Sequence, residues 1–219
     1  MTREQIAGPA VEAYLVELSQ AQHRSPVLDE MEERAARDGF PIVGPSVGRY
    51  LELQARAVGA RRVVELGSGF GYSAYWFARA VGPDGTVVCT DGSATNAGDA
   101  QRYLTQAGVW DRVDYRVGDA LEGLAATEGD FDVVYCDVDK DGYPACFAAG
   151  AERLRVGGVY LCDNTLWRGL AATGDADPDH PGWVDAIRRH NELVANDHRF
   201  VSQIVPIRDG VMVAVKVSA

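Results

Sequence analysis

The sequence is short of positive charge, and this shortage limits what the protein can bind. Its 219 residues include 21 Lys and Arg against 32 Asp and Glu, which gives a formal net charge of -11. Binding to a phosphate backbone requires clustered Lys and Arg, and no such cluster occurs along the chain. This balance disfavours a nucleic-acid-binding protein, although it leaves open a small local basic patch.

Long apolar runs and paired cysteines are also missing. No apolar run approaches the ~20 residues of a membrane-spanning helix, and the N-terminal stretch lacks the basic-then-apolar order of a secretory signal. Cys89, Cys136, Cys146 and Cys162 form no CxxC pair, and three of them lie inside apolar runs, which is typical of buried free thiols. We therefore expect a soluble, cytoplasmic protein with reduced thiols and no membrane partner.

Internal repeats and low-complexity tracts are absent as well, which argues against a repeat array. A hydrophobic content of 47% over this length is enough for one sizeable core. We therefore expect a single domain over residues 1–219. Within it, residues 1–58 should form a helical cap and residues 59–219 an α/β core.

The expected cap carries several helix signals. Ser25 followed by Pro26 predicts a helix start, and Gly39 predicts its end. Thr2 and Gln5 have the spacing of a capping box. A further helix is expected over residues 46–57.

After the cap, short Val-rich runs alternate with helix-like segments. The runs are RRVVEL, GTVVCTD, RVDYRV, FDVVYCD and GGVYLCD. Strands without polar alternation, spaced by helices, predict a mostly parallel sheet with helices on both faces. The last runs, FVSQIVPI and GVMVAVKV, are joined at residues 208–210 and predict a hairpin that adds an antiparallel strand. The acidic segment at residues 174–182 is expected to be a long surface loop.

A glycine-rich turn follows the first predicted strand. Gly67, Gly69 and Gly71 stand between that strand and a helix, where glycine allows a sharp turn and a close approach to a ligand. The dehydrogenase fingerprint requires glycine at position 72, where this chain has Tyr72. Asp91 ends the next strand, where a carboxylate can accept both hydroxyls of a ribose. The pattern favours an adenosyl ligand, and the alternatives are a tight packing turn and a helix-start charge.

Two later strands end in acidic residues. Asp137 and Asp139 follow the fourth strand, and Asp163 and Asn164 follow the fifth. Because the carboxyl ends of parallel strands meet at one edge of a sheet, these side chains should converge near the glycine turn. Carboxylate and amide oxygens suit Mg²⁺, Mn²⁺ or Ca²⁺, whereas no His or Cys has zinc-ligand spacing. Each aspartate taken alone would also fit a helix cap.

These motifs together resemble a known enzyme family. The segments VVELGSGFGYSA, DVDKDGY, DNTLWRG and DGVMVAVK are similar to the cation-dependent class I O-methyltransferases that use S-adenosylmethionine, the catechol and caffeoyl-coenzyme A family. The resemblance covers about residues 43–217. It implies a Rossmann-like methyltransferase fold of seven strands, a divalent cation and a homodimer.

The resemblance also assigns roles position by position. It makes Asp137, Asp163 and Asn164 the metal ligands and places Lys140 beside the reacting hydroxyl as the catalytic base. The cofactor positions that it implies are Val43, Gly44, Glu65, Gly67, Ser73, Asp91, Asp119, Ala120 and Asp137. Some plant members have threonine at the position of Val43, so the resemblance does not imply that this protein shares the substrate of the plant enzymes.

Methyl transfer needs a deprotonated acceptor oxygen aimed at the methyl carbon. Lys140 would take the proton if nearby positive charge lowers its pKa; the alternative is a surface lysine paired with Asp139 or Asp141. Trp167 and Tyr143 could wall an aromatic acceptor, or could pack in the core.

The function expected is therefore metal-dependent methylation of one hydroxyl of a small phenolic compound with two adjacent hydroxyls. One alternative is a methyltransferase for 5-hydroxyuridine at the tRNA wobble position, which the missing basic patch disfavours. A nicotinamide-dependent dehydrogenase is disfavoured by Tyr72. A cofactor-binding protein without catalysis is disfavoured by the intact metal set and Lys140.

Overall fold

The computed structural model describes residues 9–22 and 25–219. The predicted capping box at Thr2 and Gln5 lies outside these residues. No helix of the described ranges is long and apolar enough to cross a membrane.

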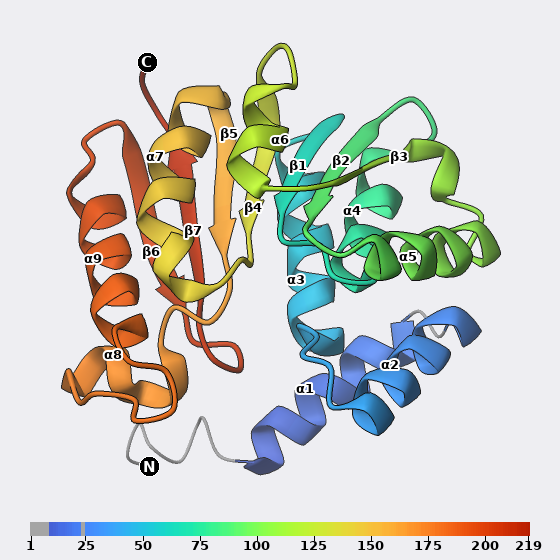
Figure 1. Ribbon diagram of the computed structural model, residues 1–219, viewed down its shortest axis with the longest axis horizontal. Coiled ribbons are helices and arrows are strands. Elements are labelled where there is room, and N and C mark those ends of the chain that lie inside the picture. The colour runs from blue at the N-terminus through green and yellow to red at the C-terminus, as the bar shows by residue number, and fades with distance from the viewer. Residues whose placement is uncertain (1–8, 23–24) are drawn as a thin grey trace.

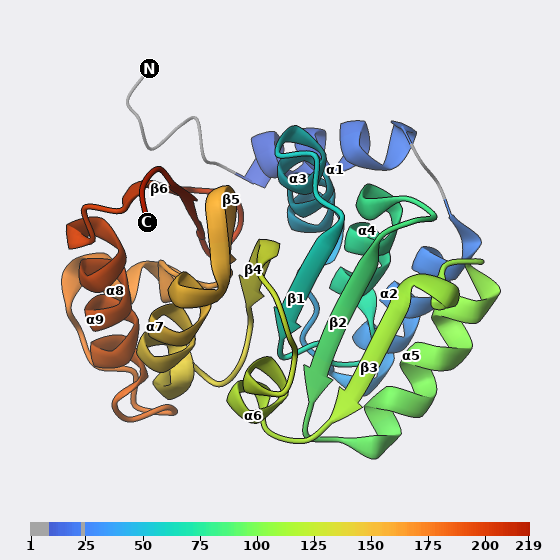
Figure 2. The same ribbon diagram turned by 90° about the horizontal axis from the view of Figure 1, so that it is seen from above.

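A seven-stranded sheet forms the centre of the molecule, with strand order β3-β2-β1-β4-β5-β7-β6 (Figure 1). Strands β1 to β5 are parallel, and β7 pairs antiparallel with both β5 and β6. Figure 2 shows β5, β4, β1, β2 and β3 in this order across the molecule. The strands are β1 (Arg62–Leu66), β2 (Thr86–Asp91), β3 (Val113–Val117), β4 (Phe131–Cys136), β5 (Leu154–Cys162), β6 (Phe200–Val205) and β7 (Val211–Lys216). The predicted fold class, including the C-terminal hairpin, is confirmed.

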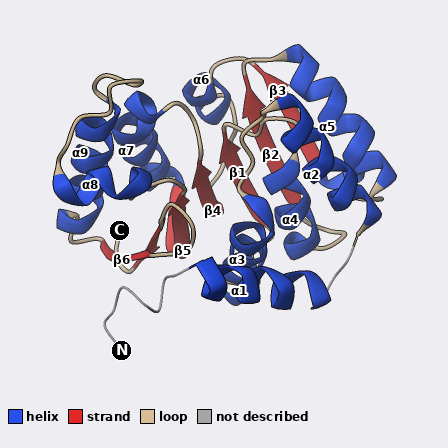
Figure 3. Ribbon diagram, turned by 90° about the horizontal axis from the view of Figure 1, so that it is seen from below, coloured by secondary structure: helices blue, strands red, loops and turns tan. Residues whose placement is uncertain are grey.

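Helices cover both faces of the sheet, as Figure 3 shows. The α-helices are α1 (Pro9–Gln22), α2 (Pro26–Asp38), α3 (Gly44–Ala57), α4 (Tyr72–Val81), α5 (Ala94–Gln106), α6 (Ala120–Ala125), α7 (Tyr143–Arg153), α8 (Leu170–Thr173) and α9 (Trp183–Asn196). Single turns of 3₁₀ helix occur at η2 (Trp110–Arg112), η3 (Lys140–Gly142) and η4 (Trp167–Gly169).

Neighbouring strand residues point to opposite faces and bury two separate cores. Val63 and Val133 pack with residues of α2, α3, α4 and α5. Val64 and Val134 pack with residues of α6, α7 and α9. Burial on both faces explains why these strands read as continuous apolar runs in the sequence.

The helix signals in the cap are largely confirmed. Helix α2 begins at Pro26 and ends before Gly39, which has a left-handed φ of 65°. Ser25 is the N-cap residue, but its side chain makes no capping hydrogen bond. Helix α3 begins at Gly44, two residues before the expected start of 46. The acidic segment at residues 174–182 contains no helix or strand.

Candidate functional site

A cavity of about 1260 Å³ opens at the carboxyl ends of the parallel strands. Its lining comes from α2, the start of α3, the ends of β1, β2, β4 and β5, and the chain around residues 167–183. The predicted site residues that line it are Val43, Gly67, Ser73, Asp91, Asp119, Ala120, Asp137, Lys140, Asp163 and Asn164. The structure therefore gathers nearly the whole predicted set around one space.

The glycine turn packs tightly against the end of β4. Gly67 has a φ of 87°, and a Cβ atom added there would lie 2.4 Å from the carbonyl oxygen of Asp137. The amides of Gly67 and Ser68 both donate to the carbonyl of Thr90, at 3.1 and 2.9 Å. Glycine is thus required at position 67 because two strand ends meet there.

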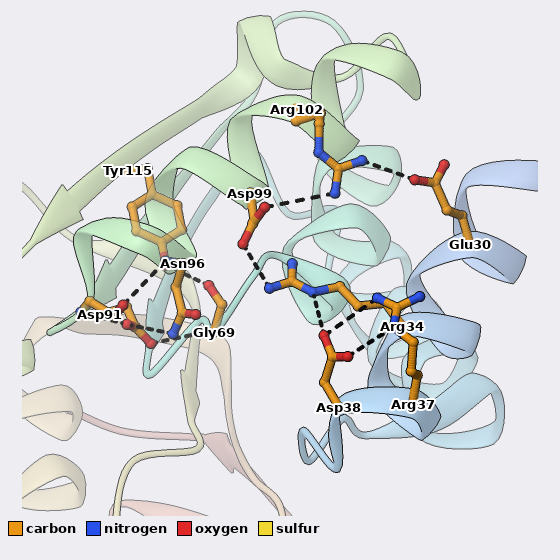
Figure 4. Close-up of polar contacts among 11 residues, drawn as sticks. Glu30, Arg34, Arg37, Asp38, Gly69, Asp91, Asn96, Asp99, Arg102 and Tyr115 are labelled. Atoms are coloured by element: carbon orange, nitrogen blue, oxygen red, sulfur yellow. Dashed lines mark hydrogen bonds and ion pairs between the residues drawn. The ribbon is translucent and has the colours of Figure 1, made fainter.

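Asp91 is held by protein groups as well as facing the cavity (Figure 4). Its carboxylate accepts hydrogen bonds from the amide of Gly69 at 2.9 Å, the amide of Ser93 at 2.8 Å and the side chain of Asn96 at 3.0 Å. Tyr115 fixes the same turn through its hydroxyl, which donates to the carbonyl of Gly69 at 2.5 Å. Asp91 therefore supports the start of α5 and the glycine turn, in addition to any contact with a ribose.

Two predicted cofactor positions, Gly44 and Glu65, do not line the cavity. Glu65 is fully buried beneath the turn, and its Oε1 has no hydrogen-bond partner in the described part of the chain. Burial raises the pKa of Glu65 to about 7, and the polar groups of Ser73, Ser68 and Cys89 oppose this shift. Its role towards the cofactor stays a prediction.

Two cavity residues begin helices at the expected cofactor positions. The Oδ1 atom of Asp119 accepts from the amides of Leu121 and Glu122, both at 2.9 Å, and so caps α6. Val43 is the N-cap residue of α3, and its carbonyl accepts from the side chain of Arg208. Arg208 also lines the cavity, and sequence reasoning did not identify it as a site residue.

Helix α2 lines the same cavity as the glycine turn. Ion pairs tie it to α5, with Arg34 Nη2 2.7 Å from Asp99 Oδ2 and Arg102 Nη1 2.9 Å from Glu30 Oε1 (Figure 4). The hydroxyl of Tyr72 on α4 donates to Glu32 at 2.6 Å.

The acidic ends of β4 and β5 lie side by side. Cys136 and Cys162 are register partners, so Asp137 and Asp163 follow at adjacent positions. The Asp163 residue is 3% exposed, and its Oδ1 has no hydrogen-bond partner among the described residues. Burial, and then the charge of Asp137, raise the pKa of Asp163 to about 7. Two carboxyl groups thus follow adjacent strand ends, and one oxygen of Asp163 is unpaired among the described residues.

Lys140 lies directly beside this pair. Its Nζ is 3.1 Å from Asp137 Oδ1, and its side chain is only 9% exposed. Burial lowers the pKa of Lys140, but the carboxylate of Asp137 outweighs burial, and the pKa lies above its ordinary value. The lysine is therefore a buried ammonium group paired with Asp137, and not a surface lysine paired with Asp139 or Asp141.

Strained backbone is concentrated on this side of the cavity. Within the described ranges, the non-glycine residues with positive φ are Asn164 (55°), Trp167 (44°), Arg168 (55°) and Arg208 (48°). Left-handed conformations cost a non-glycine residue of order 1 kcal/mol and persist only where surrounding contacts enforce them.

The neighbours of Asn164 are anchored by side chains that the sequence did not reveal. The hydroxyl of Tyr143 donates to the carbonyl of Asp163 at 2.8 Å. Asn191 of α9 donates through Nδ2 to the carbonyl of Thr165, also at 2.8 Å. These bonds hold the chain on both sides of Asn164. Tyr143 itself is fully buried, so core packing is the correct reading for that residue.

Three aromatic side chains line the cavity together: Trp167 of η4, His180, and Trp183 at the start of α9. We call them the aromatic wall. His180 stacks on Trp183 with ring centroids 4.2 Å apart, and Trp167 meets Trp183 edge-on at 5.3 Å. The buried carboxylate of Asp177 accepts from Trp167 Nε1 at 2.7 Å and contacts His180 Nδ1 at 3.1 Å. The sequence left Trp167 open between a wall residue and a core residue, and it did not point to His180, Trp183 or Asp177.

Comparison with known proteins identifies the family. A family profile described as O-methyltransferase matches residues 17–217, which is most of the chain. The chain belongs to this O-methyltransferase family. The predicted resemblance is confirmed, and with it the prediction that the protein is an O-methyltransferase.

Relatives of this O-methyltransferase include plant and bacterial proteins. The caffeoyl-CoA O-methyltransferase of Eucalyptus gunnii is 29% identical over 219 residues, covering 94% of this chain and 87% of the relative. The catechol O-methyltransferase of Mycobacterium tuberculosis is 40% identical over 138 residues, covering 62% of this chain and 63% of the relative.

Solved structures of O-methyltransferases share the fold. The enzyme from Bacillus cereus in complex with SAH has a TM-score of 0.84 at 29% identity, covering 94% of this chain and 97% of that one. TomG from Streptomyces achromogenes, involved in tomaymycin synthesis and in complex with SAM, has a TM-score of 0.83 at 28% identity, with full coverage of both chains.

Proposed function

We propose that this enzyme transfers a methyl group from S-adenosylmethionine to one hydroxyl of a small aromatic compound with two adjacent hydroxyls, with the help of a divalent cation. The observation that carries the proposal is the meeting of Asp137 and Asp163 in the same cavity as the glycine turn, with Lys140 beside them. Donor and acceptor would then lie in one space at the edge of the sheet.

The glycine-turn side of the cavity suits the adenosyl cofactor. Gly67 lines it directly after β1 and Ser73 at the start of α4, and Asp91 and Asp119 line it from the neighbouring strand ends. Val43 would pass over the methionine part, with Ala120 on the adenine side. The solved O-methyltransferase structures with SAH or SAM bound support the choice of this cofactor.

The acidic side of the cavity fits a hard divalent cation. Asp163 offers a buried oxygen that has no hydrogen-bond partner among the described residues, Asp137 adds a second carboxylate, and Asn164 adds a neutral amide. A bound Mg²⁺, or Mn²⁺ or Ca²⁺, would lower the pKa of a chelated diol and fix its ring. In the described ranges no group of three or more His, Cys, Asp or Glu side chains could hold a metal. The proposed set has only two such side chains, and its support is the unpaired oxygen of Asp163.

Lys140 is placed to accept the proton of the acceptor hydroxyl. The charge of Asp137 raises its pKa, whereas burial lowers it. When the charges of Asp137 and Asp163 are neutralised, the main causes of the upward shift are removed and burial, which lowers the pKa, remains. The Lys140 ammonium group would then lose its proton more readily and could act as a base.

The acceptor is proposed to be a small phenolic compound. The aromatic wall offers flat ring faces on the side of the cavity that holds Lys140, whose Nζ lies 5.9 Å from the ring centre of Trp167. A tRNA acceptor is disfavoured by the net charge of -11. We further propose that the enzyme works in the cytoplasm as a homodimer.

A substrate screen tests the proposal. The enzyme would be incubated with S-adenosylmethionine and a catechol, a matched monophenol or tRNA, each with and without chelator. We expect the enzyme to methylate the catechol, and we expect the chelator to abolish this methylation. Methylation of tRNA but not catechol would favour the alternative acceptor, and chelator-resistant turnover would reject the cation.

A further inference from the structure

Arg208 lines the cavity and extends from the turn between β6 and β7 to the backbone before α3. Its Nη1 donates to the carbonyl of Ile42 at 2.9 Å and also to the carbonyl of Val43. The guanidinium lies close against Gly44, where an added Cβ would be 3.1 Å from Nη1. The Arg208 side chain therefore holds, through hydrogen bonds, the backbone that leads into α3.

The turn that carries Arg208 is itself fixed on the acceptor side of the cavity. The amide of Leu166 donates to the carbonyl of Asp209 at 2.8 Å, and the amide of Thr165 donates to that of Gly210 at 3.0 Å. The base from which the arginine extends is therefore rigidly tied to the chain that follows Asn164.

The backbone conformation of Arg208 indicates that this turn position carries an arginine because of its side chain. Its φ of 48° is left-handed, and Gly or Asn ordinarily fills such a turn position at less cost. An arginine there is unfavourable for the turn alone. What it adds is a cationic donor long enough to reach residues 42–43.

We propose that Arg208 is a positioning residue that holds residues 42–44 over the methionine part of S-adenosylmethionine. This inference rests on the cofactor placement proposed above. A cover segment that is already ordered loses less conformational entropy when the cofactor binds, so the arginine increases cofactor affinity through the backbone that it holds.

Calorimetric titration of the full chain with S-adenosylhomocysteine tests this role. Arg208→Ala should weaken binding by about 5- to 50-fold, because two charge-assisted hydrogen bonds to the cover segment are lost. Arg208→Lys keeps a cationic donor and should recover part of the affinity. Gly44→Ala crowds the same contact from the other side and should also weaken binding.

Arg61→Ala provides the matched control, since the Arg61 side chain is 63% exposed and forms a 3.4 Å ion pair with Asp84. Its affinity should equal that of the parent. In Arg208→Ala the melting temperature without ligand should stay near the parent's, and the rise on adding S-adenosylhomocysteine should be smaller.

Parent-like affinity in Arg208→Ala would overturn the proposal. An equally weak Arg208→Lys variant, with a melting temperature lowered to the same extent without ligand, would also overturn it, because that result shows a general structural role. These titrations contain no methyl acceptor or metal, so their outcome is independent of whether catechols are the substrates.

Discussion

At the scale of single residues, the site depends on the charge of a few buried groups. Lys140 and Asp137 form an ion pair with only 9% of the lysine side chain exposed. Asp163 beside them has a pKa raised to about 7 by burial and by Asp137. Proton positions in this cluster therefore respond to pH near neutrality, which gives two direct tests.

The first test concerns Lys140 as a base. Lys140→Ala should lower turnover near pH 7 by about 10²- to 10⁴-fold, the usual contribution of a positioned base. Raising the pH should restore part of the loss, because the acceptor then ionises without help. Affinity for S-adenosylhomocysteine, measured by calorimetry, should stay near that of the parent.

Lys140→Arg is the matched control, since it keeps the positive charge but cannot give up its proton. We expect it to be as slow as Lys140→Ala near neutral pH. Normal turnover of Lys140→Ala at every pH would show that the lysine is not the base.

The second test concerns the folded-state pKa of Asp163. Its pKa rises from the ordinary 3.8 to about 7, so the folded protein binds this proton more tightly than the unfolded chain. Stability from this group is therefore full below pH 4 and is lost as pH rises towards 7, by of order 1–4 kcal/mol. In Asp163→Asn, melting temperatures measured in chelator should fall less between pH 5 and 8 than in the parent.

Part of the slope should remain in Asp163→Asn, because the pKa of buried Glu65 is also about 7. Asp141→Asn alters an exposed acid that lines the same cavity and should keep the full slope. An identical pH dependence in Asp163→Asn and the parent would contradict the assignment.

At the scale of elements, the glycine turn joins the two halves of the site. Gly67→Ala should destabilise the protein by about 1–3 kcal/mol, because its Cβ would lie 2.4 Å from the Asp137 carbonyl and its φ is 87°. Denaturant unfolding measures this loss. Gly98→Ala in α5, where nothing lies within 4 Å of the added Cβ, should be neutral or slightly stabilising. Equal stabilities of the two variants would contradict the required contact.

The segment before α9 holds the aromatic wall through one carboxylate. Hydrogen bonds from Trp167 and His180, together with nearby Arg168, keep the pKa of Asp177 near 2 against the effect of burial, so it is ionised at working pH. Asp177→Asn should raise KM for a catechol severalfold while leaving kcat and S-adenosylhomocysteine affinity nearly unchanged. Steady-state kinetics measure this, with the exposed Asp175→Asn as control. An unchanged KM would exclude the wall from acceptor binding.

The sequence predicted those parts of the site that follow from chain order. Asp137 and Asp163 could be placed together because neighbouring parallel strands end at one edge of the sheet. Arg208, Asn191 and Asp177 could not be placed in the same way. Their partners are backbone or side-chain groups reached through loops, and hydrophobic periodicity in the sequence does not specify the conformation of a loop. The interpretation of Asp91 was incomplete for the same reason, because its bond to the Gly69 amide depends on the shape of the turn.

At the scale of the whole molecule, two layers of helices around one sheet leave a single edge where strand ends and loops build the site. The net charge of -11 makes a cationic partner at the acidic pair favourable and an anionic polymer unfavourable. The proposed reaction therefore requires both a divalent cation and a vicinal diol.

The most direct measurement compares the rates of methylation of a catechol and the matched monophenol by the parent enzyme, in chelator and after adding excess Mg²⁺. Only the catechol should be methylated rapidly, since two adjacent oxygens can occupy two open positions of the cation. Chelator should remove this activity, and Mg²⁺ should restore it. Equal rates for the two phenols, or full activity in chelator, would show that the reaction does not depend on a chelated diol.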